Sequence, residues 1–73
     1  MKNRLTVIRA EQRLSQEDLA VKAGISRTTL SGIENGKNVP DGETIAKLVK
    51  ALGVPANQIF FDFDVVSTQQ RGE

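Results

Sequence analysis

The apolar residues of the chain recur at helical spacing in four successive stretches. Their intervals of three, four and seven positions are those of side chains that share one face of an α-helix. The clearest stripe is formed by Ile45, Leu48, Val49 and Leu52. A fifth, shorter stretch covers residues 55–60. The pattern predicts an all-α chain of five helices.

Capping residues set the bounds of these helices. The predicted helices are residues 3–13, the two segments that open at Ser15 and Ser26, the segment that follows Asp41, and residues 55–60. Ser15 and Asp18 have the spacing of a capping box, in which each side chain bonds a backbone N–H of the other residue. Gly24 and Gly53 are placed to end helices in the left-handed conformation, which costs glycine least. The helix that opens at Ser26 is expected to reach Asn35.

The second and third predicted helices are separated by a very short turn. Two short helices joined this tightly cross at a steep angle, which is the geometry of a helix-turn-helix. The second helix of such a pair can enter the major groove of DNA. The same geometry also occurs in proteins that do not bind DNA, so the spacing alone leaves an ordinary surface helix open.

The third helix has an apolar side and a polar side. Leu30 and Ile33 are three positions apart and point inward together. The residues expected on the opposite side are Arg27, Thr28, Ser31, Gly32 and Asn35. This polar stripe carries an arginine and no acid. The Arg27 guanidinium can donate two hydrogen bonds to guanine, or it can clamp a phosphate. The stripe favours DNA recognition over a merely solvated helix face.

Composition excludes several other functions. The chain has 73 residues, enough for one small domain, and lacks cysteine, histidine and tryptophan. Most transition-metal sites and most nucleophile–base pairs are therefore excluded, and we expect no cofactor, no metal and no enzymatic activity. Asp62 and Asp64 alone offer too few ligands for Mg²⁺. No signal-peptide pattern or long apolar run is present, so a cytoplasmic protein without membrane contact is expected.

The net charge of +1 hides an uneven distribution. Residues 1–40 contain seven basic and four acidic side chains, whereas residues 41–73 contain three basic and five acidic ones. The basic half contains the polar stripe, as a polarised DNA-binding surface requires. A split of this size could also arise by chance in so short a chain.

The C-terminal segment has a different period. From Phe61 to Val65 apolar and acidic side chains alternate, which is typical of a strand. Phe61, Phe63 and Val65 are the candidate dimer interface, together with the fifth helix, because one strand alone buries nothing. They could pair with the N-terminus or with a second subunit, or the segment could be a disordered acidic tail. We therefore divide the chain into a helix-turn-helix domain, residues 1–60, and a C-terminal extension, residues 61–73. For the extension a short dimerisation strand and a disordered tail are the two alternatives, and residues 67–73 are expected to fray.

With these motifs assembled, the chain resembles the lambda-repressor/Cro-like helix-turn-helix family, also called XRE-like. The matching segments are Leu14–Ala20, Gly24–Ser26, Ile33–Lys37, Pro40 and Ala51–Val54. The resemblance covers residues 4–60 and implies a five-helix domain that binds double-stranded DNA as a homodimer on a palindromic operator and regulates transcription. A narrower likeness, over residues 27–34, is to the controller proteins of restriction–modification systems. Phage repressors and antitoxins share most of these residues.

The resemblance also implies roles for individual residues. Base contacts are expected from Arg27, Thr28 and Ser31. Phosphate contacts are expected from Gln16, Ser26, Asn35 and Lys37. Arg9 and Glu34 match a charge pair that ties the first helix to the third. Gly32 departs from the family pattern, because many relatives carry glutamine, arginine or lysine at this position.

A second class of function remains open on the sequence. The same fold could serve as an antitoxin or as a protein-interaction module, with a toxin or RNA polymerase as partner and the phenylalanine-rich segment facing it. Salt dependence separates the two classes, since DNA binding weakens steeply with salt and an apolar protein contact does not.

Overall fold

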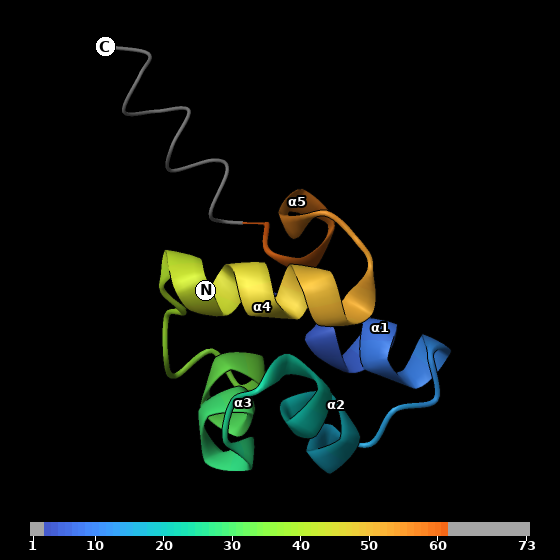
Figure 1. Ribbon diagram of the computed structural model, residues 1–73. Helices are drawn as coiled ribbons and strands as arrows, with labels where there is room; N and C mark the ends of the chain where they lie inside the picture. The colour runs from blue at the N-terminus through green and yellow to red at the C-terminus, as the bar shows by residue number, and fades with distance from the viewer. Residues whose placement is uncertain (1–2, 62–73) are drawn as a thin grey trace, which may run out of the picture.

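The computed structural model describes residues 3–61 of the chain, and this part is all-α apart from one isolated bridge. Its helices are α1 (Leu5–Glu11), α2 (Gln16–Ala23), α3 (Arg27–Glu34), α4 (Gly42–Leu52) and α5 (Ala56–Ile59). In Figure 1, α4 crosses the middle of the domain, with α2 and α3 on one side and α5 on the other. The prediction of five helices is confirmed for the described residues.

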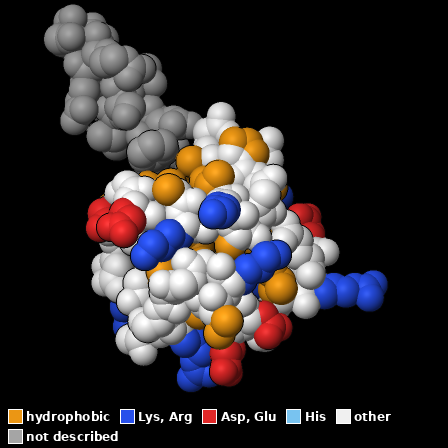
Figure 2. Space-filling model, in the orientation of Figure 1, with side chains coloured by type: hydrophobic (Ala, Val, Ile, Leu, Met, Phe, Trp, Pro, Cys, Tyr) orange, Lys and Arg blue, Asp and Glu red, His pale blue; other side chains and the backbone are white. Residues whose placement is uncertain are grey.

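One apolar core joins all five helices. Its buried residues are Leu5, Ile8, Leu19, Ala20, Ala23, Leu30, Ile33, Leu48, Ala51, Leu52, Ile59 and Phe60. α2 packs against both α3 and α4, and α4 packs against α5. Hydrophobic side chains on the face shown in Figure 2 form small, separate patches among polar and basic ones. The inward orientation predicted for Leu30 and Ile33 is confirmed, since both are almost fully buried.

The predicted caps are present at three helix starts. The Ser15 hydroxyl accepts from the Asp18 N–H at 2.9 Å, and an Asp18 carboxylate oxygen accepts from the Ser15 N–H at 3.0 Å. The Ser15 backbone and then its hydroxyl hold the pKa of the Asp18 carboxyl below its usual value. Ser26 accepts from the Thr29 N–H, and Asp41 accepts from the Thr44 N–H. The hydrogen bonds from the side chain and then the backbone of Thr44 likewise lower the pKa of Asp41.

The ends of α2 and α4 agree with the prediction, whereas the bounds of α1 and α5 differ from it. Gly24 and Gly53 are both left-handed, with φ of 73° and 74°. The first helix is shorter than the expected 3–13 at both ends: Arg4 is its N-cap, and after Glu11 the positive φ of 59° at Arg13 turns the chain toward α2. The fifth helix has Pro55 as its N-cap, and Phe60 is already extended.

The two ends of the described chain meet in a single antiparallel bridge. Asn3 pairs with Phe60, and the Arg4 N–H donates to the Ile59 carbonyl at 2.9 Å. Phe61, where the predicted strand starts, follows the bridge and is 41% exposed. Phe63, Val65, Asp62, Asp64 and the frayed end predicted for residues 67–73 lie outside the described residues. Within residues 3–61, no helix is both long and apolar enough to cross a membrane.

Candidate nucleic-acid interface

The turn between α2 and α3 fixes the position of the third helix. Gly24 donates to the Val21 carbonyl and Ile25 to the Ala20 carbonyl, so α2 ends in hydrogen bonds that its left-handed glycine allows. Ser26 then caps α3 after one further residue. Leu30 and Ile33 anchor the helix to the core, which leaves its other side on the surface. The two helices and their turn form a helix-turn-helix.

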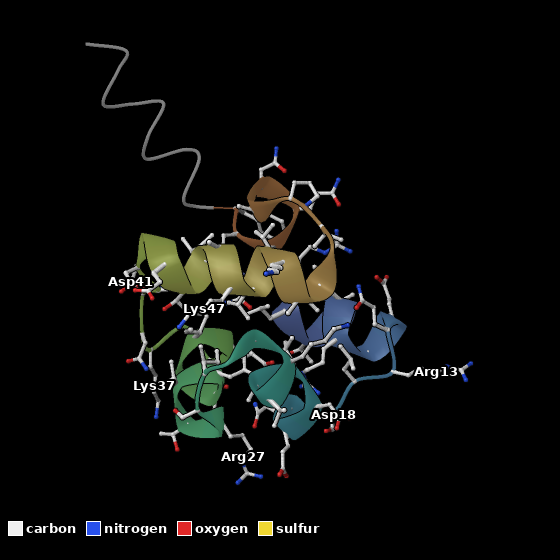
Figure 3. The ribbon with its side chains drawn as sticks, viewed as in Figure 1. Arg13, Asp18, Arg27, Lys37, Asp41 and Lys47 are labelled. Atoms are coloured by element: carbon white, nitrogen blue, oxygen red, sulfur yellow. The ribbon has the colours of Figure 1, made fainter. Side chains whose placement is uncertain are left out.

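The outward side of α3 borders a polar hollow of about 360 Å³. We call this the α3 hollow, and its lining residues are Gln16, Arg27, Thr28, Ser31, Gly32, Asn35, Lys37 and Asn38. Six of the eight were singled out from the sequence as base or phosphate contacts. The lining contains two cationic side chains and no acid. In Figure 3, Arg27 projects away from the body of the domain at α3, and Lys37 projects from the loop that follows this helix.

Most polar side chains of the hollow have no partner in the protein. Within residues 3–61, the side chains of Arg27, Thr28, Ser31, Asn35 and Lys37 make no hydrogen bond or ion pair. Their donors and acceptors are therefore available to a ligand. A rigid helix that presents unpaired donors with net positive charge suits a polyanion whose edges carry acceptors.

Gln16 links the hollow to the inner side of α3. Its Nε2 donates to Glu34 Oε1 at 3.2 Å, and the residue is half-buried at the start of α2. This hydrogen bond braces α3 against α2. Gln16 thus faces the hollow from a fixed position.

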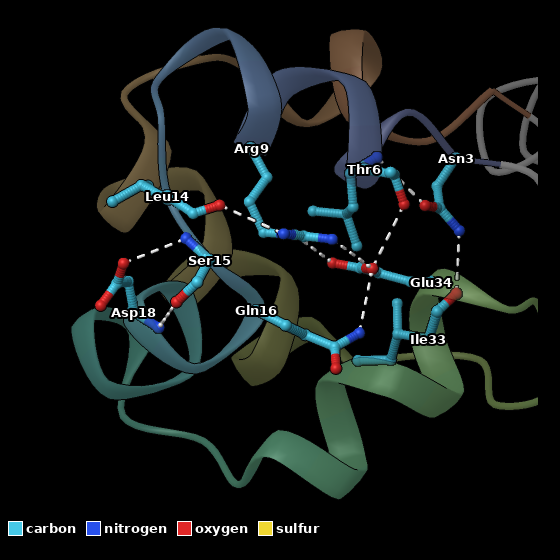
Figure 4. Close-up of polar contacts among 10 residues, drawn as sticks. Asn3, Thr6, Arg9, Leu14, Ser15, Gln16, Asp18, Ile33 and Glu34 are labelled. Atoms are coloured by element: carbon cyan, nitrogen blue, oxygen red, sulfur yellow. Dashed lines mark hydrogen bonds and ion pairs between the residues drawn. The ribbon is translucent and has the colours of Figure 1, made fainter.

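Arg9 and Glu34 form an ion pair between α1 and α3. Arg9 Nε lies 2.9 Å from Glu34 Oε2, and Arg9 Nη2 lies 3.2 Å from Oε1, which makes the pair bidentate. The Glu34 side chain is 5% exposed and also accepts from the Thr6 hydroxyl, as Figure 4 shows. Arg9 Nη1 donates to the Leu14 carbonyl at 3.1 Å. The pair therefore fixes α1, the α1–α2 connection and α3 together.

Ser26 lies outside the lining of the hollow. Its hydroxyl accepts from the Thr29 N–H at 3.0 Å and donates to the Thr29 hydroxyl at 2.8 Å. The hydroxyl therefore uses both its acceptor and its proton within the first turn of α3. A phosphate contact from this hydroxyl would have to compete with the Thr29 hydroxyl for its proton.

Sequence reasoning missed two asparagines that contact α3. Asn3 Nδ2 donates to the Ile33 carbonyl at 2.9 Å and so satisfies a carbonyl near the end of α3 (Figure 4). Asn38 lines the hollow from the loop after α3. The only local signal for Asn38 is Gly36, whose left-handed φ of 78° turns the chain back toward the helix.

The fold and this surface define a helix-turn-helix DNA-binding domain. A family model described as Helix-turn-helix matches residues 7–59. The chain therefore belongs to the helix-turn-helix family of transcriptional regulators, in its XRE-like branch.

Individual relatives agree with this assignment. The chain is 47% identical over 60 residues to an uncharacterized HTH-type transcriptional regulator of Methanocaldococcus jannaschii, covering 82% of this chain and 91% of the relative. It is 40% identical over 58 residues to the HTH-type transcriptional repressor RghR of Bacillus subtilis, covering 78% of this chain but only 43% of that longer protein. Its fold is similar to the restriction-modification controller protein C.AhdI from Aeromonas hydrophila, with a TM-score of 0.74, 35% identity, and coverage of 78% and 86% of the two chains.

Proposed function

We propose that this protein is a sequence-specific regulator of transcription that binds a palindromic DNA operator as a homodimer, with α3 in the major groove. The observation that carries the proposal is the α3 hollow, an acid-free surface of unpaired polar side chains on a helix whose other side is fixed in the core. Its similarity to transcriptional repressors and to a controller protein supports a regulatory role.

Three side chains of α3 read base edges in this proposal. The planar Arg27 guanidinium donates two hydrogen bonds to guanine O6 and N7. Thr28 offers its methyl group to thymine and its hydroxyl to a neighbouring base, and Ser31 offers a hydroxyl. Their exposed or half-buried positions along one side of α3 support this assignment.

The remaining polar residues contact the sugar-phosphate backbone. Lys37 supplies charge, whereas Gln16 and Asn35 supply neutral donors. Ser26 joins them when its hydroxyl exchanges the bond to the Thr29 hydroxyl for a phosphate oxygen. Gln16 lies at the first position of α2 and Ser26 caps α3, so both also lie where the helix dipole favours an anion. These contacts orient α3 and carry no sequence information themselves.

A second copy completes the proposed binding unit. Two reading helices about 34 Å apart would contact successive major grooves on one face of the DNA. Phe61, Phe63 and Val65 are the proposed dimer contacts. The 41% exposure of the large apolar Phe61 side chain at the end of the described chain supports this choice.

The dimer contact is tested with Phe61→Asp. A charge in an apolar interface leaves a carboxylate without water or partner, so the variant should sediment as a monomer in analytical ultracentrifugation. Its helical circular dichroism should match the wild type, because Phe61 lies outside the core. Dimers of unchanged affinity would place the interface elsewhere.

DNA reading is tested by selecting bound duplexes from a randomised pool at low ionic strength, using the full chain. The expected product is an inverted repeat with half-sites about one helical turn apart. The association constant of the protein for this DNA should fall as the salt concentration rises. The slope of its logarithm against the logarithm of the salt concentration should be about −0.9 for each phosphate contact. Enrichment of no sequence, or binding insensitive to salt, would contradict the proposal and favour a protein partner.

A further inference from the structure

The outward side of α3 lacks a side chain at Gly32. This residue lies one turn after Thr28 and borders the α3 hollow. The space beyond its Cα is nevertheless filled. A Cβ built on Gly32 would clash with Asn38 Nδ2 and lie 2.9 Å from Asn38 Cγ. The amide of Asn38 therefore occupies the place on the helix surface that a side chain at position 32 would take.

Backbone hydrogen bonds hold Asn38 over this site. After the left-handed turn at Gly36, the N–H groups of Lys37 and Asn38 both donate to the Gly32 carbonyl, at 2.9 and 3.1 Å. Two residues further on, Pro40 is buried and fixes the end of the loop. The residue that covers Gly32 is thus anchored to Gly32 itself. Its amide is placed by the same hydrogen bonds that end the helix.

The amide of Asn38 is free to bind a ligand. Within the described residues its side chain makes no hydrogen bond, and the residue is exposed. It lies in the lining of the hollow with Arg27 and Thr28. An unpaired amide presents two donors and an acceptor in one plane.

We infer that Asn38 is a base-reading residue that takes the place of a side chain at Gly32, and that it recognises adenine. The inference rests on the proposed function. An asparagine amide can accept from adenine N6 and donate to N7 at the same time, a pair of bonds that the edges of the other bases do not offer. Neither Arg27 nor the hydroxyls of Thr28 and Ser31 duplicates this pattern. The recognition surface therefore includes the loop after α3 as well as the helix.

The main test compares duplexes selected by the wild type with those selected by Asn38→Ala. The variant should lose an A·T preference at one base pair in each half-site, by about 5- to 100-fold in relative affinity. Preference at the base pair read by Arg27 should remain. Asn57→Ala is the matched control, because Asn57 is an exposed asparagine on α5, away from the hollow; it should select the wild-type sequence.

A second variant, Gly32→Ala, displaces the amide of Asn38 without changing that residue. Gly32 has no positive φ, so alanine fits the backbone of α3. The three atoms nearest to the new methyl group of Gly32→Ala all belong to the Asn38 side chain, which must move aside. This variant should lose the same A·T preference while its thermal unfolding stays at or above that of the wild type. Adding Asn38→Ala to it should cause no further loss.

Different failures have different meanings. If Asn38→Ala weakens binding to all sequences equally, Asn38 contacts a phosphate and the inference is wrong. Unchanged selection by Asn38→Ala would overturn it as well. If the wild type enriches no duplex at all, the proposed DNA-reading function fails before any variant is compared.

Discussion

The two sides of α3 differ in how many of their side chains are buried or hydrogen-bonded within the protein. On the inner side, Leu30 and Ile33 are almost fully buried, and Glu34 accepts hydrogen bonds from three residues. On the outer side, Arg27 and Thr28 make no contact with a polar partner within residues 3–61. One side therefore supplies the stability of the helix, and the other keeps its hydrogen-bonding groups for a ligand.

This division suits a small DNA-binding domain. A chain of this size is marginally stable, so each buried contact is a large fraction of its free energy of unfolding. A surface that must change its sequence to read a new operator cannot also hold the fold together. The Arg9–Glu34 pair and its neighbours fix the axis of α3 from behind, which lets the outer residues vary at little cost in stability.

The largest effect is expected on the inner side, for Glu34→Ala. The substitution leaves the Arg9 guanidinium, 18% exposed, without its carboxylate, and also removes the acceptor of Gln16 and Thr6. The free energy of unfolding should fall by about 3–5 kcal/mol, measured by urea denaturation.

Glu43→Ala is the matched control for this change. Glu43 pairs with Lys47 at 3.7 Å, and its side chain is 78% exposed. Such a surface pair contributes about 0.5 kcal/mol or less. Equal stabilities of the Glu34 and Glu43 variants would show that the inner ion pair does not support the fold.

A smaller effect of a different kind is expected on the outer side, for Arg27→Ala. Because Arg27 has no partner in the described protein, the free energy of unfolding should stay within about 0.5 kcal/mol of the wild type. Discrimination at one base pair should drop by about 1–3 kcal/mol in competition binding with single-base variants of the selected site. Equal weakening on every sequence would instead identify Arg27 as a phosphate contact.

The same contrast explains what the sequence predicted. Ser15, Ser26 and Asp41 act on N–H groups three residues away, and Leu30 and Ile33 follow from helix periodicity, so short-range rules were enough. The C-terminal end of the first helix is not predictable in this way, because no local signal marks the positive φ of Arg13. The sequence also did not predict contacts that depend on how the chain folds back on itself.

Two of the contacts that the sequence did not predict involve α3. The hydrogen bond from Asn3 to the Ile33 carbonyl joins residues thirty positions apart. The placement of Asn38 over Gly32 depends on how the loop returns after Gly36. The outward positions of Arg27, Thr28 and Ser31 came from spacing, whereas their likeness to reading residues came from the family resemblance.

The smallest effect is expected for Asp41→Asn. It tests whether an exposed side chain that makes a hydrogen bond contributes to stability, in contrast to one that makes none. Asp41 and Arg27 are both exposed, but Asp41 caps α4 by accepting from the Thr44 N–H at 2.9 Å. Its pKa is lowered in the folded protein, so the carboxylate stabilises the fold at neutral pH and loses this effect as the pH falls from about 4 through the folded pKa. Asparagine caps a helix nearly as well but does not titrate. The melting temperature of the wild type should therefore exceed that of Asp41→Asn at pH 7, and the difference should shrink as the pH falls below about 4. In Arg27→Ala no such pH-dependent difference from the wild type is expected, because the guanidinium has no partner within residues 3–61. A constant difference for Asp41→Asn across this range would mean that the charge of Asp41 does not contribute to the cap.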